Sequence, residues 1–398
     1  MKLTTEWNNE AYDVVMERLH AEGFVAYAVG GCVRDAVMGL PFNDVDVATN
    51  ARPHDLPKVF GVRQWDGDSD TRTNDEGVVL YPTGVRHGTW TVRVGDDTVE
   101  VTSFRKDVDT DGRNATVEYA DTMEVDAERR DFTMNALYCD RNNDVHDPTG
   151  NGIADLLAGH VRFVGNAEDR VKEDYLRILR LFRFHARFGR GPMNSEAWSA
   201  ASKWAFMIPA KVSGERVWDE TKKLLGLHSP FEACAEMSAT LVASKLFEKF
   251  DMSALGELMA NERAHNCAPR WSRRYAALVG GEITFPCSNS DREEVGALQK
   301  ALDGPMVGIS QAVIAHRHGD VAAFDWALMR GARVNHKEIT RGSEAVFPVT
   351  AQDLMDRGFT PGKALGDELR MLNTIWERSD LTQTREKLLN FSATVVRK

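Results

Sequence analysis

Apolar residues recur at two different periods along the chain, and the period changes near residue 160. In the segment 8–19 the apolar positions have helical spacing, and they are Tyr12, Val15, Met16 and Leu19. After Gly23 the pattern predicts a short strand over 24–29, a turn, a helix over 33–38 and a strand over 44–48 whose acidic and apolar residues alternate. The first helix is therefore followed by a unit made of a strand, a turn, a helix and a second strand.

Two further strands are predicted over 87–94 and 98–104, paired across the turn 95–97. We therefore expect a mixed α/β domain over residues 1–160. Beyond Ala167 helical periodicity dominates, with predicted helices over 168–188, 196–207, 213–226, 231–249 and 364–377. In this all-α part Trp271, Trp326 and Trp376 are expected to pack in the core.

Length and composition are those of an ordinary soluble protein, with 398 residues, 42% of them hydrophobic and 27% charged. The sequence has no run of about 18 apolar residues, so no membrane partner is expected. The five cysteines form no Cys-x-x-Cys pair, which favours a reducing compartment and a cytoplasmic location. Nothing in the sequence indicates a protein partner.

The net charge of −11 argues against a nucleic-acid partner when it is averaged over the whole chain, because phosphate binding needs a basic surface. The charge is unevenly distributed, however. Residues 1–160 hold 15 Lys and Arg against 30 Asp and Glu, residues 161–224 hold 13 against 8, and the remainder holds 21 against 22. The short basic stretch can therefore contact phosphates although the protein as a whole is acidic.

A glycine turn followed by two alternating aspartates is the first pattern that points to chemistry. Gly30 and Gly31 stand between a predicted strand and helix, where backbone N–H groups can approach a phosphate, and Arg34 adds a positive charge. Asp44 and Asp46 alternate along the next strand, so both carboxylates face one side. A divalent cation would relieve their repulsion.

Glu100 is the candidate third carboxylate. It lies between apolar residues of the predicted strand 98–104, so its side chain emerges on the opposite face from theirs. Three carboxylates favour Mg²⁺, and such a site can activate a 3′-hydroxyl for attack on an α-phosphate and offset the charge of the departing pyrophosphate. The pattern therefore predicts nucleotidyl transfer, with Asp44, Asp46 and Glu100 as catalytic and metal-binding residues.

Two later motifs carry candidate nucleotide-binding residues. Between Glu128 and Leu137, Arg130 suits a triphosphate, while Asp131 and Asn135 are placed one helical turn apart to hold sugar or backbone groups. A solvated cluster of ion pairs is the structural alternative for this motif.

Arginines recur every third residue after Asp174, in what the pattern predicts to be one helix over 168–188. Arg177, Arg180 and Arg183 form a ridge with Asp174 on the surface of this helix. An ionised Asp only accepts hydrogen bonds and an Arg only donates them, so Asp174 and Arg177 match a base edge with an amino group beside a ring acceptor. Cytosine and adenine both present such an edge, whereas uracil and guanine do not.

The motifs together resemble those of class II tRNA nucleotidyltransferases, the CCA-adding enzymes, over about residues 24–224. The segments that carry the resemblance are GGCVRD (30–35), DVDVATNARP (44–53), VEVTSFRKD (99–107), ERRDFTMNAL (128–137) and RFVGNAEDRVKEDYLRILRLFRF (162–184). The resemblance implies an α+β fold with a polymerase-β-like nucleotidyltransferase head over 1–160. An all-α neck over 161–224 would recognise the base, and an all-α body and tail over 225–398 would bind tRNA.

In such enzymes the counterparts of Asp44 and Asp46 bind Mg²⁺. The counterparts that contact the incoming nucleotide are those of Gly31, Arg34, Arg130, Asp174, Arg177, Arg180 and Arg183. The resemblance thus implies addition of C, C and A to the tRNA 3′ end from CTP and ATP. It also implies tRNA contacts through the 3′ end and acceptor arm.

Three alternatives stay open. Bacterial poly(A) polymerases resemble this family through the same head and neck. CC-adding or A-adding enzymes are also related, although CC-adding relatives lack part of the segment after the third carboxylate, which looks complete here over 105–119. A non-catalytic RNA-binding protein would keep the fold, but the presence of Asp44, Asp46 and Glu100 argues for catalysis.

Overall fold

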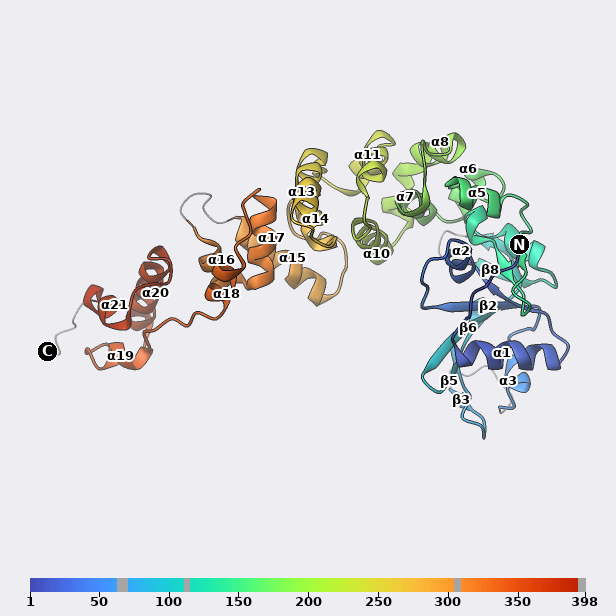
Figure 1. Ribbon diagram of the computed structural model, residues 1–398, viewed down its shortest axis with the longest axis horizontal. Helices are drawn as coiled ribbons and strands as arrows, with labels where there is room; N and C mark the ends of the chain where they lie inside the picture. Colours follow the sequence, from blue (N-terminus) through green and yellow to red (C-terminus); the bar gives the residue numbers. More distant parts are fainter. Residues whose placement is uncertain (63–70, 111–114, 304–308, 393–398) are drawn as a thin grey trace. The chain divides into compact units, whose positions relative to one another are not determined.

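The structure is a computed structural model that describes residues 1–62, 71–110, 115–303 and 309–392 (Figure 1). Residues 111–114, which belong to the segment 105–119 discussed above, lie outside the described residues. The chain divides into two compact units. Unit 1 comprises Met1–Leu224 with Glu232–Leu246, and unit 2 comprises Leu225–Phe231 with Phe247–Lys398.

A mixed β-sheet forms the centre of the N-terminal part of unit 1. Its strand order, among the described residues, is β10-β9-β1-β2-β6-β5-β4-β3, and β7 pairs separately with β8. The strands are β1 (Ala26–Val29), β2 (Val45–Thr49), β3 (Arg72–Thr73), β4 (Val79–Gly84), β5 (Thr89–Val94), β6 (Asp97–Ser103), β7 (Arg105–Thr110), β8 (Ala115–Tyr119), β9 (Tyr138–Cys139) and β10 (Val145–His146).

The remaining elements of the chain up to Leu246 are helical. They are α1 (Glu10–Ala21), α2 (Gly31–Val37), α3 (Leu56–Val59), η1 (Val85–His87), α4 (Met123–Glu128), η2 (Thr133–Asn135), α5 (Gly152–Ala158), α6 (Ala167–Glu173), α7 (Leu176–Phe188), α8 (Ser195–Trp204), η3 (Ala205–Met207), α9 (Ile208–Lys211), α10 (Gly214–Leu225), α11 (Phe231–Ala239) and α12 (Val242–Leu246). The expected α+β fold class with a helical remainder is confirmed.

Local sequence explains how the first elements form. Asn9 caps α1 by accepting a hydrogen bond from the backbone N–H of Tyr12 at 2.8 Å. The apolar stripe predicted for this helix is buried and packs on β5 and β6, while α2 packs on β1 and β2 (Figure 1). The predicted hairpin is present as β5 and β6, which pair from Val94↔Asp97 to Thr89↔Thr102 across Gly95 and Asp96.

The prediction of a single helix over 168–188 is wrong, because the helical conformation is interrupted at Asp174, between α6 and α7. Asp174 is extended, with φ −151° and ψ 106°, and its Oδ1 accepts a hydrogen bond from the N–H of Leu176 at 3.0 Å. Aspartate at such a position satisfies a free N–H of the following helix, so the break is stabilised locally. The helix predicted over 231–249 is also divided, at Leu241 with φ 63°.

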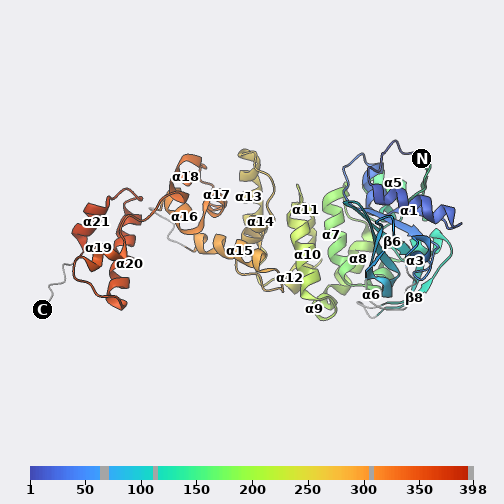
Figure 2. The same ribbon diagram turned by 90° about the horizontal axis from the view of Figure 1, so that it is seen from below.

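All regular secondary structure in the described residues of unit 2 is helical (Figure 2). Its helices are α13 (Met252–Ala264), α14 (Trp271–Leu278), α15 (Asn289–Leu302), α16 (Gln311–His318), α17 (Asp320–Met329), α18 (His336–Ser343), α19 (Ala351–Met355), α20 (Lys363–Arg378) and α21 (Arg385–Phe391). Trp326 and Trp376 pack in its apolar clusters as predicted, whereas Trp271 is only partly buried.

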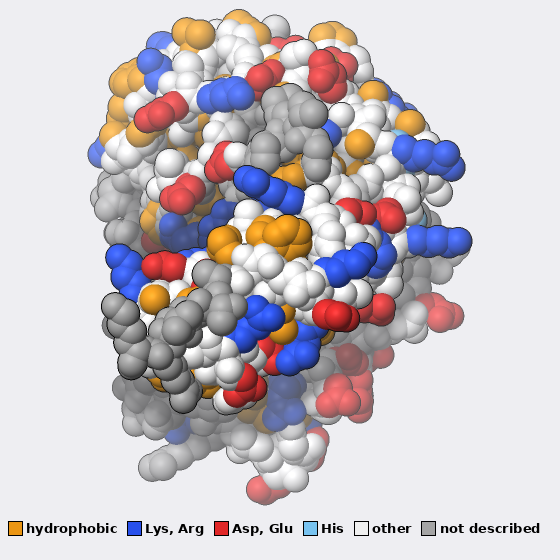
Figure 3. Space-filling view, turned by 90° about the vertical axis from the view of Figure 1, so that its left-hand side faces the viewer, with side chains coloured by type: hydrophobic (Ala, Val, Ile, Leu, Met, Phe, Trp, Pro, Cys, Tyr) orange, Lys and Arg blue, Asp and Glu red, His pale blue; other side chains and the backbone are white. Residues whose placement is uncertain are grey.

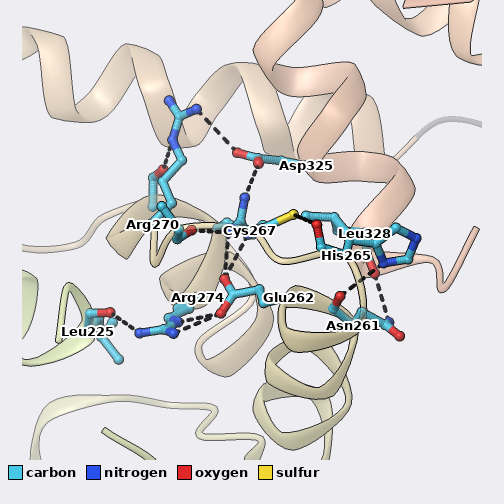
Figure 4. A network of polar contacts seen from close by, with 12 residues as sticks. Leu225, Asn261, Glu262, His265, Cys267, Arg270, Arg274, Asp325 and Leu328 are labelled. Atoms are coloured by element: carbon cyan, nitrogen blue, oxygen red, sulfur yellow. Dashed lines mark hydrogen bonds and ion pairs between the residues drawn. The ribbon is translucent and has the colours of Figure 1, made fainter. Parts of the chain in front are cut away.

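A network of buried charges links α13, α14 and α17 in unit 2 (Figure 4). Glu262 accepts hydrogen bonds from Arg273 at 2.6 Å and from Arg274 at 2.8 Å, one on each carboxylate oxygen. Arg273 also binds Asp325 at 2.6 Å. These four side chains are almost fully buried, so each charge relies on its partners instead of on water.

Acidic and basic side chains are interspersed over the face that Figure 3 presents. None of the helices described above combines the length and apolar character needed to span a bilayer.

Candidate functional site

The glycine turn lies where β1 ends and α2 begins. Gly30 has φ 77°, which favours glycine, and a Cβ there would lie 3.3 Å from Nη1 of Arg130. A Cβ on Gly31 would lie 3.7 Å from Nη2 of Arg34. Gly30 therefore lets Arg130 approach the turn closely, whereas the space beside Gly31 would accommodate a Cβ.

The carboxylates predicted to bind metal come from neighbouring parallel strands. Asp46 on β2 is in register with Glu100 on β6, and the valines on either side of each are buried. Burial raises the pKa of Asp46 to about 6, and the nearby charges of Glu100 and Asp44 act in the same direction, while Arg130 opposes them. Negative charge is therefore concentrated where β2 and β6 lie side by side in the middle of the sheet.

Such a donor set fits a hard divalent cation, because carboxylate oxygens are its preferred ligands and its charge would favour the ionised form of Asp46. No group of three His, Cys, Asp or Glu side chains in the described part of the chain is already arranged around a metal position.

A pocket of about 450 Å³ opens beside Asp46, between the glycine turn and the helices α7 and α10. It gathers every predicted nucleotide-binding residue except Arg183. Its lining residues are Gly30, Gly31, Arg34, Asp46, Arg129, Arg130, Asp131, Asn135, Asp174, Leu176, Arg177, Arg180, Phe184 and Arg216. Asp44 and Glu100 lie outside this lining, as does Arg183.

Polar contacts connect the two sides of the pocket. Arg34 donates to Oδ1 of Asn135 at 2.6 Å, and the Asn135 amide donates to Asp131 at 3.0 Å. Asp131 in turn accepts from Nε of Arg180 on α7 at 2.7 Å. Burial would raise the pKa of Asp131, but Arg180, the amide of Asn135 and Arg177 lower it to about 2. Asp131 and Asn135 are therefore in contact, although η2 and not an α-helix joins them.

Asp126 is a supporting residue that sequence reasoning missed. It is fully buried and accepts hydrogen bonds from Arg129 at 2.8 Å, Arg130 at 2.8 Å and the hydroxyl of Tyr138 at 2.7 Å. Burial raises its pKa, but the two arginines and Tyr138 outweigh that effect and lower it to about 2. The spacing of three and four residues from Asp126 to the arginines was the available signal.

The two residues predicted to read the base both line the pocket, but each contacts other groups. Oδ2 of Asp174 accepts from Arg216 on α10 at 2.6 Å, a contact that sequence reasoning also missed. Nη1 of Arg177 donates to Glu173 at 2.7 Å, and its Nη2 donates to the backbone oxygen of Arg129 at 2.9 Å. These contacts fix the direction of both side chains.

Arg183 lies behind the pocket and pairs with the buried Glu220 of α10 at 2.5 Å. Arg180 is 3.8 Å from the same carboxylate. Glu220 therefore connects two of the predicted arginines to α10.

A larger cavity of about 920 Å³ lies in unit 2, between the loop 265–270 and helices α17 and α18. Its buried charges belong to the network of α13, α14 and α17 described above. Arg273 donates hydrogen bonds to Glu262, to Asp325 and to the backbone oxygen of Ala268. The smaller pocket of unit 1 is therefore the better candidate for chemistry.

Comparison with known proteins agrees with this assignment. The family described as the Poly A polymerase head domain matches residues 26–162, which contain the glycine turn and the sheet carboxylates. The fold and site thus define a nucleotidyltransferase of this class.

Relatives that align with nearly the whole chain identify a narrower family within the nucleotidyltransferases. The CCA tRNA nucleotidyltransferase 1, mitochondrial, of Mus musculus is 31% identical over 392 residues, covering 91% of this chain and 85% of its own. The CCA-adding enzyme of Latilactobacillus sakei is 30% identical, covering 98% and 99%. The chain therefore belongs to the CCA-adding enzyme family, whose members generally use a divalent metal.

A solved structure supports the same conclusion. The CCA-adding enzyme of Bacillus stearothermophilus in complex with CTP aligns with a TM-score of 0.70 and 25% identity, covering 96% of this chain and 95% of the other. The similarity therefore extends to the helical parts, where the sequence alone offered few motifs.

Proposed function

We propose that this protein adds C, C and A in turn to the 3′ end of tRNA, using CTP and ATP and releasing pyrophosphate. The observation that carries the proposal is the pocket of unit 1, where Asp174 and Arg177 lie with Arg34, Arg130 and Arg180 beside Asp46. Family membership and the CTP complex of the Bacillus stearothermophilus relative support CTP as one substrate.

Asp174 and Arg177 are proposed to select the base. A carboxylate oxygen accepts two hydrogen bonds, so Asp174 can receive a base amino group while it keeps its contacts with Leu176 and Arg216. Arg177 has five N–H donors and could supply one to a ring nitrogen. Both contacts suit cytosine and adenine, so one pocket would accept CTP and ATP.

The phosphates are proposed to contact the arginines on the other side of the pocket. Arg34, Arg130 and Arg180 are the candidates, with Arg183 supporting them from behind. Gly30 and Gly31 allow close approach of the backbone, while Asp131 and Asn135 hold Arg34 and Arg180 in place and can orient the sugar.

Asp44, Asp46 and Glu100 are proposed to hold Mg²⁺. When bound, the ion would supply positive charge that favours deprotonation of an attacking 3′-hydroxyl and offsets charge on the phosphates.

The direct test supplies tRNAs that end before CCA, after the first C and after CC, each with labelled CTP or ATP alone. We expect CTP to extend the first two substrates and ATP to extend only the third. Extension of unrelated RNA by ATP alone would favour a poly(A) polymerase. Failure of only the CTP or only the ATP steps would indicate a partial enzyme, and inactivity with every RNA would favour a binding protein.

The proposed metal site is tested by Asp46→Asn, which replaces one of the three carboxylates proposed as ligands with an uncharged amide. We expect turnover to fall by about a thousandfold while tRNA affinity changes little. Asp96→Asn, at an exposed carboxyl in the turn between β5 and β6, serves as the control and should retain full activity. Undiminished turnover of Asp46→Asn would remove this residue from the metal site.

The expected division into a head over 1–160, a neck over 161–224 and a body and tail over 225–398 stays part of the proposal. In it, the C-terminal helices bind tRNA. A cytoplasmic location is likewise proposed, although the Mus musculus relative is described as mitochondrial.

A further inference from the structure

One aromatic ring in the pocket contacts three arginines. Phe184 on α7 is 4% exposed and lines the pocket of unit 1. The guanidinium carbons lie 5.2 Å from its ring centroid for Arg34, 5.3 Å for Arg180 and 4.4 Å for Arg183. These arginines come from α2 and from two successive turns of α7, so the ring joins cations from separate elements. Arg34 also lies 4.5 Å from the ring centroid of Phe188, one turn further along α7.

Each of these arginines also has an anionic partner, and Glu220 is common to two of them, because Arg180 lies 3.8 Å from the carboxylate that pairs with Arg183. Arg34 pairs with Asp35 at 2.8 Å, Arg180 with Asp131 at 2.6 Å, and Arg183 with Glu220 at 2.5 Å. Like charges that lie close together in a half-buried site repel one another. The electron-rich face of an aromatic ring attracts cations, so it can hold them near each other without neutralising them.

A carboxylate in the place of the ring would also attract the arginines, but it would cancel charge that a triphosphate needs. A leucine would fill similar space without attracting cations. The site needs a side chain that attracts the arginines and leaves their charge available to the triphosphate. The phenyl ring does both, because it is uncharged and still stabilises the guanidinium groups around it. Phe132 packs against Phe184, with ring centroids 5.1 Å apart, and limits its movement.

We propose that Phe184 is a positioning residue that holds Arg34 and Arg180 in the pocket wall that faces the phosphates of the incoming nucleotide, with Arg183 behind them. The proposal rests on the function proposed above, since it needs this pocket to bind a nucleoside triphosphate. Phe184 itself selects no base, so it acts equally on CTP and ATP.

The same helix offers a matched control. Phe182 is fully buried two residues before Phe184, and no cation contacts its ring in the described structure. Leucine at either position removes a similar volume from α7. A difference in nucleotide binding between the two variants therefore reports on the contacts of the ring with arginine and not on the general packing of the helix.

The experiment replaces Phe184 in the full chain with phenylalanine carrying one, two or three fluorine atoms, which weaken the negative ring face with little change in size. The affinities for CTP, ATP and inorganic tripolyphosphate are measured by titration. We expect all three to weaken stepwise, by about three- to tenfold for trifluorophenylalanine. Phe184→Leu should raise the KM for both nucleotides by about tenfold with a much smaller change in kcat, and Phe184→Tyr should retain most of the affinity.

The same substitutions at Phe182 should leave all three affinities unchanged. Equal effects at the two positions, or a flat fluorine series at Phe184, would overturn the proposal. Weaker binding of CTP and ATP with unchanged binding of tripolyphosphate would also overturn it, because the ring would then act on the base or sugar. Failure of the unmodified protein to bind either nucleotide would instead contradict the proposed function.

Discussion

Single carboxylates fix the direction of the arginines in the pocket of unit 1. Asp126 holds Arg129 and Arg130, Asp131 holds Arg180, and Asp174 is itself held by Arg216. Composition could not show which carboxylates hold which arginines, because acidic and basic residues enter it only through the net charge. The candidate nucleotide-binding residues were predictable since their motifs are local. Asp126 was missed because its burial is not visible in the sequence, and its spacing of three and four residues to Arg129 and Arg130 was the only local signal.

Asp126 gives a stability prediction with a defined pH dependence. Its pKa is about 2 in the folded protein and about 3.9 in an unfolded chain, so its ionised form stabilises the fold fully above pH 5. This contribution is lost as the pH falls through 4 toward 2. Asp126→Asn should therefore lower the free energy of unfolding by about 3 kcal/mol at pH 7, and this loss should be smaller by about 1 kcal/mol at pH 3, as measured by urea unfolding.

Asp121→Asn provides the comparison, because Asp121 pairs with Arg52 on the surface and its side chain is 82% exposed. Exposed pairs contribute little, so this variant should unfold like the unmodified protein at both pH values. A difference for Asp126→Asn that stays constant from pH 7 to pH 3 would contradict the assigned pKa.

Among the helices and strands, the sequence predicted the ones that form from local patterns of residues. The stripe of α1 and the hairpin of β5 and β6 were expected, because each depends on neighbouring residues. The register that places Asp46 beside Glu100 could not be predicted from the sequence, since it pairs strands whose residues are more than 50 positions apart. The break at Asp174 was missed because the arginines continue the helical spacing across it.

The same break gives a prediction about the base selection proposed for Asp174. Asp174 is in extended backbone and not within a helix, so its side-chain direction depends on Leu176 and Arg216. Arg216→Met should therefore reduce the preference for CTP over UTP, expressed as a ratio of kcat/KM, by about tenfold. Lys223→Met, on the exposed face of the same helix α10, should leave the ratio unchanged. An unaltered ratio in both variants would show that Arg216 does not position Asp174.

At the scale of the whole molecule, the charge of −11 conceals the basic segment 161–224. Many of its arginines already pair with carboxylates, as Arg177, Arg180 and Arg183 do, so few cations can neutralise RNA phosphates. Affinity for tRNA should therefore be modest, and the logarithm of the binding constant should fall with the logarithm of KCl concentration with a slope of about −3 to −5. Titration at several salt concentrations measures this slope, and a slope near zero would exclude binding through phosphates.

The buried charges of unit 2 constrain how this part of the sequence can change over time (Figure 4). Loss of Glu262 alone would leave Arg273 and Arg274 without their shared anion, and loss of either arginine would leave part of Glu262 unpaired. Each single step is therefore costly, whereas joint replacement by apolar residues of similar size could be nearly neutral. Among descendants of this chain, Glu262, Arg273 and Arg274 should be inherited together or exchanged together.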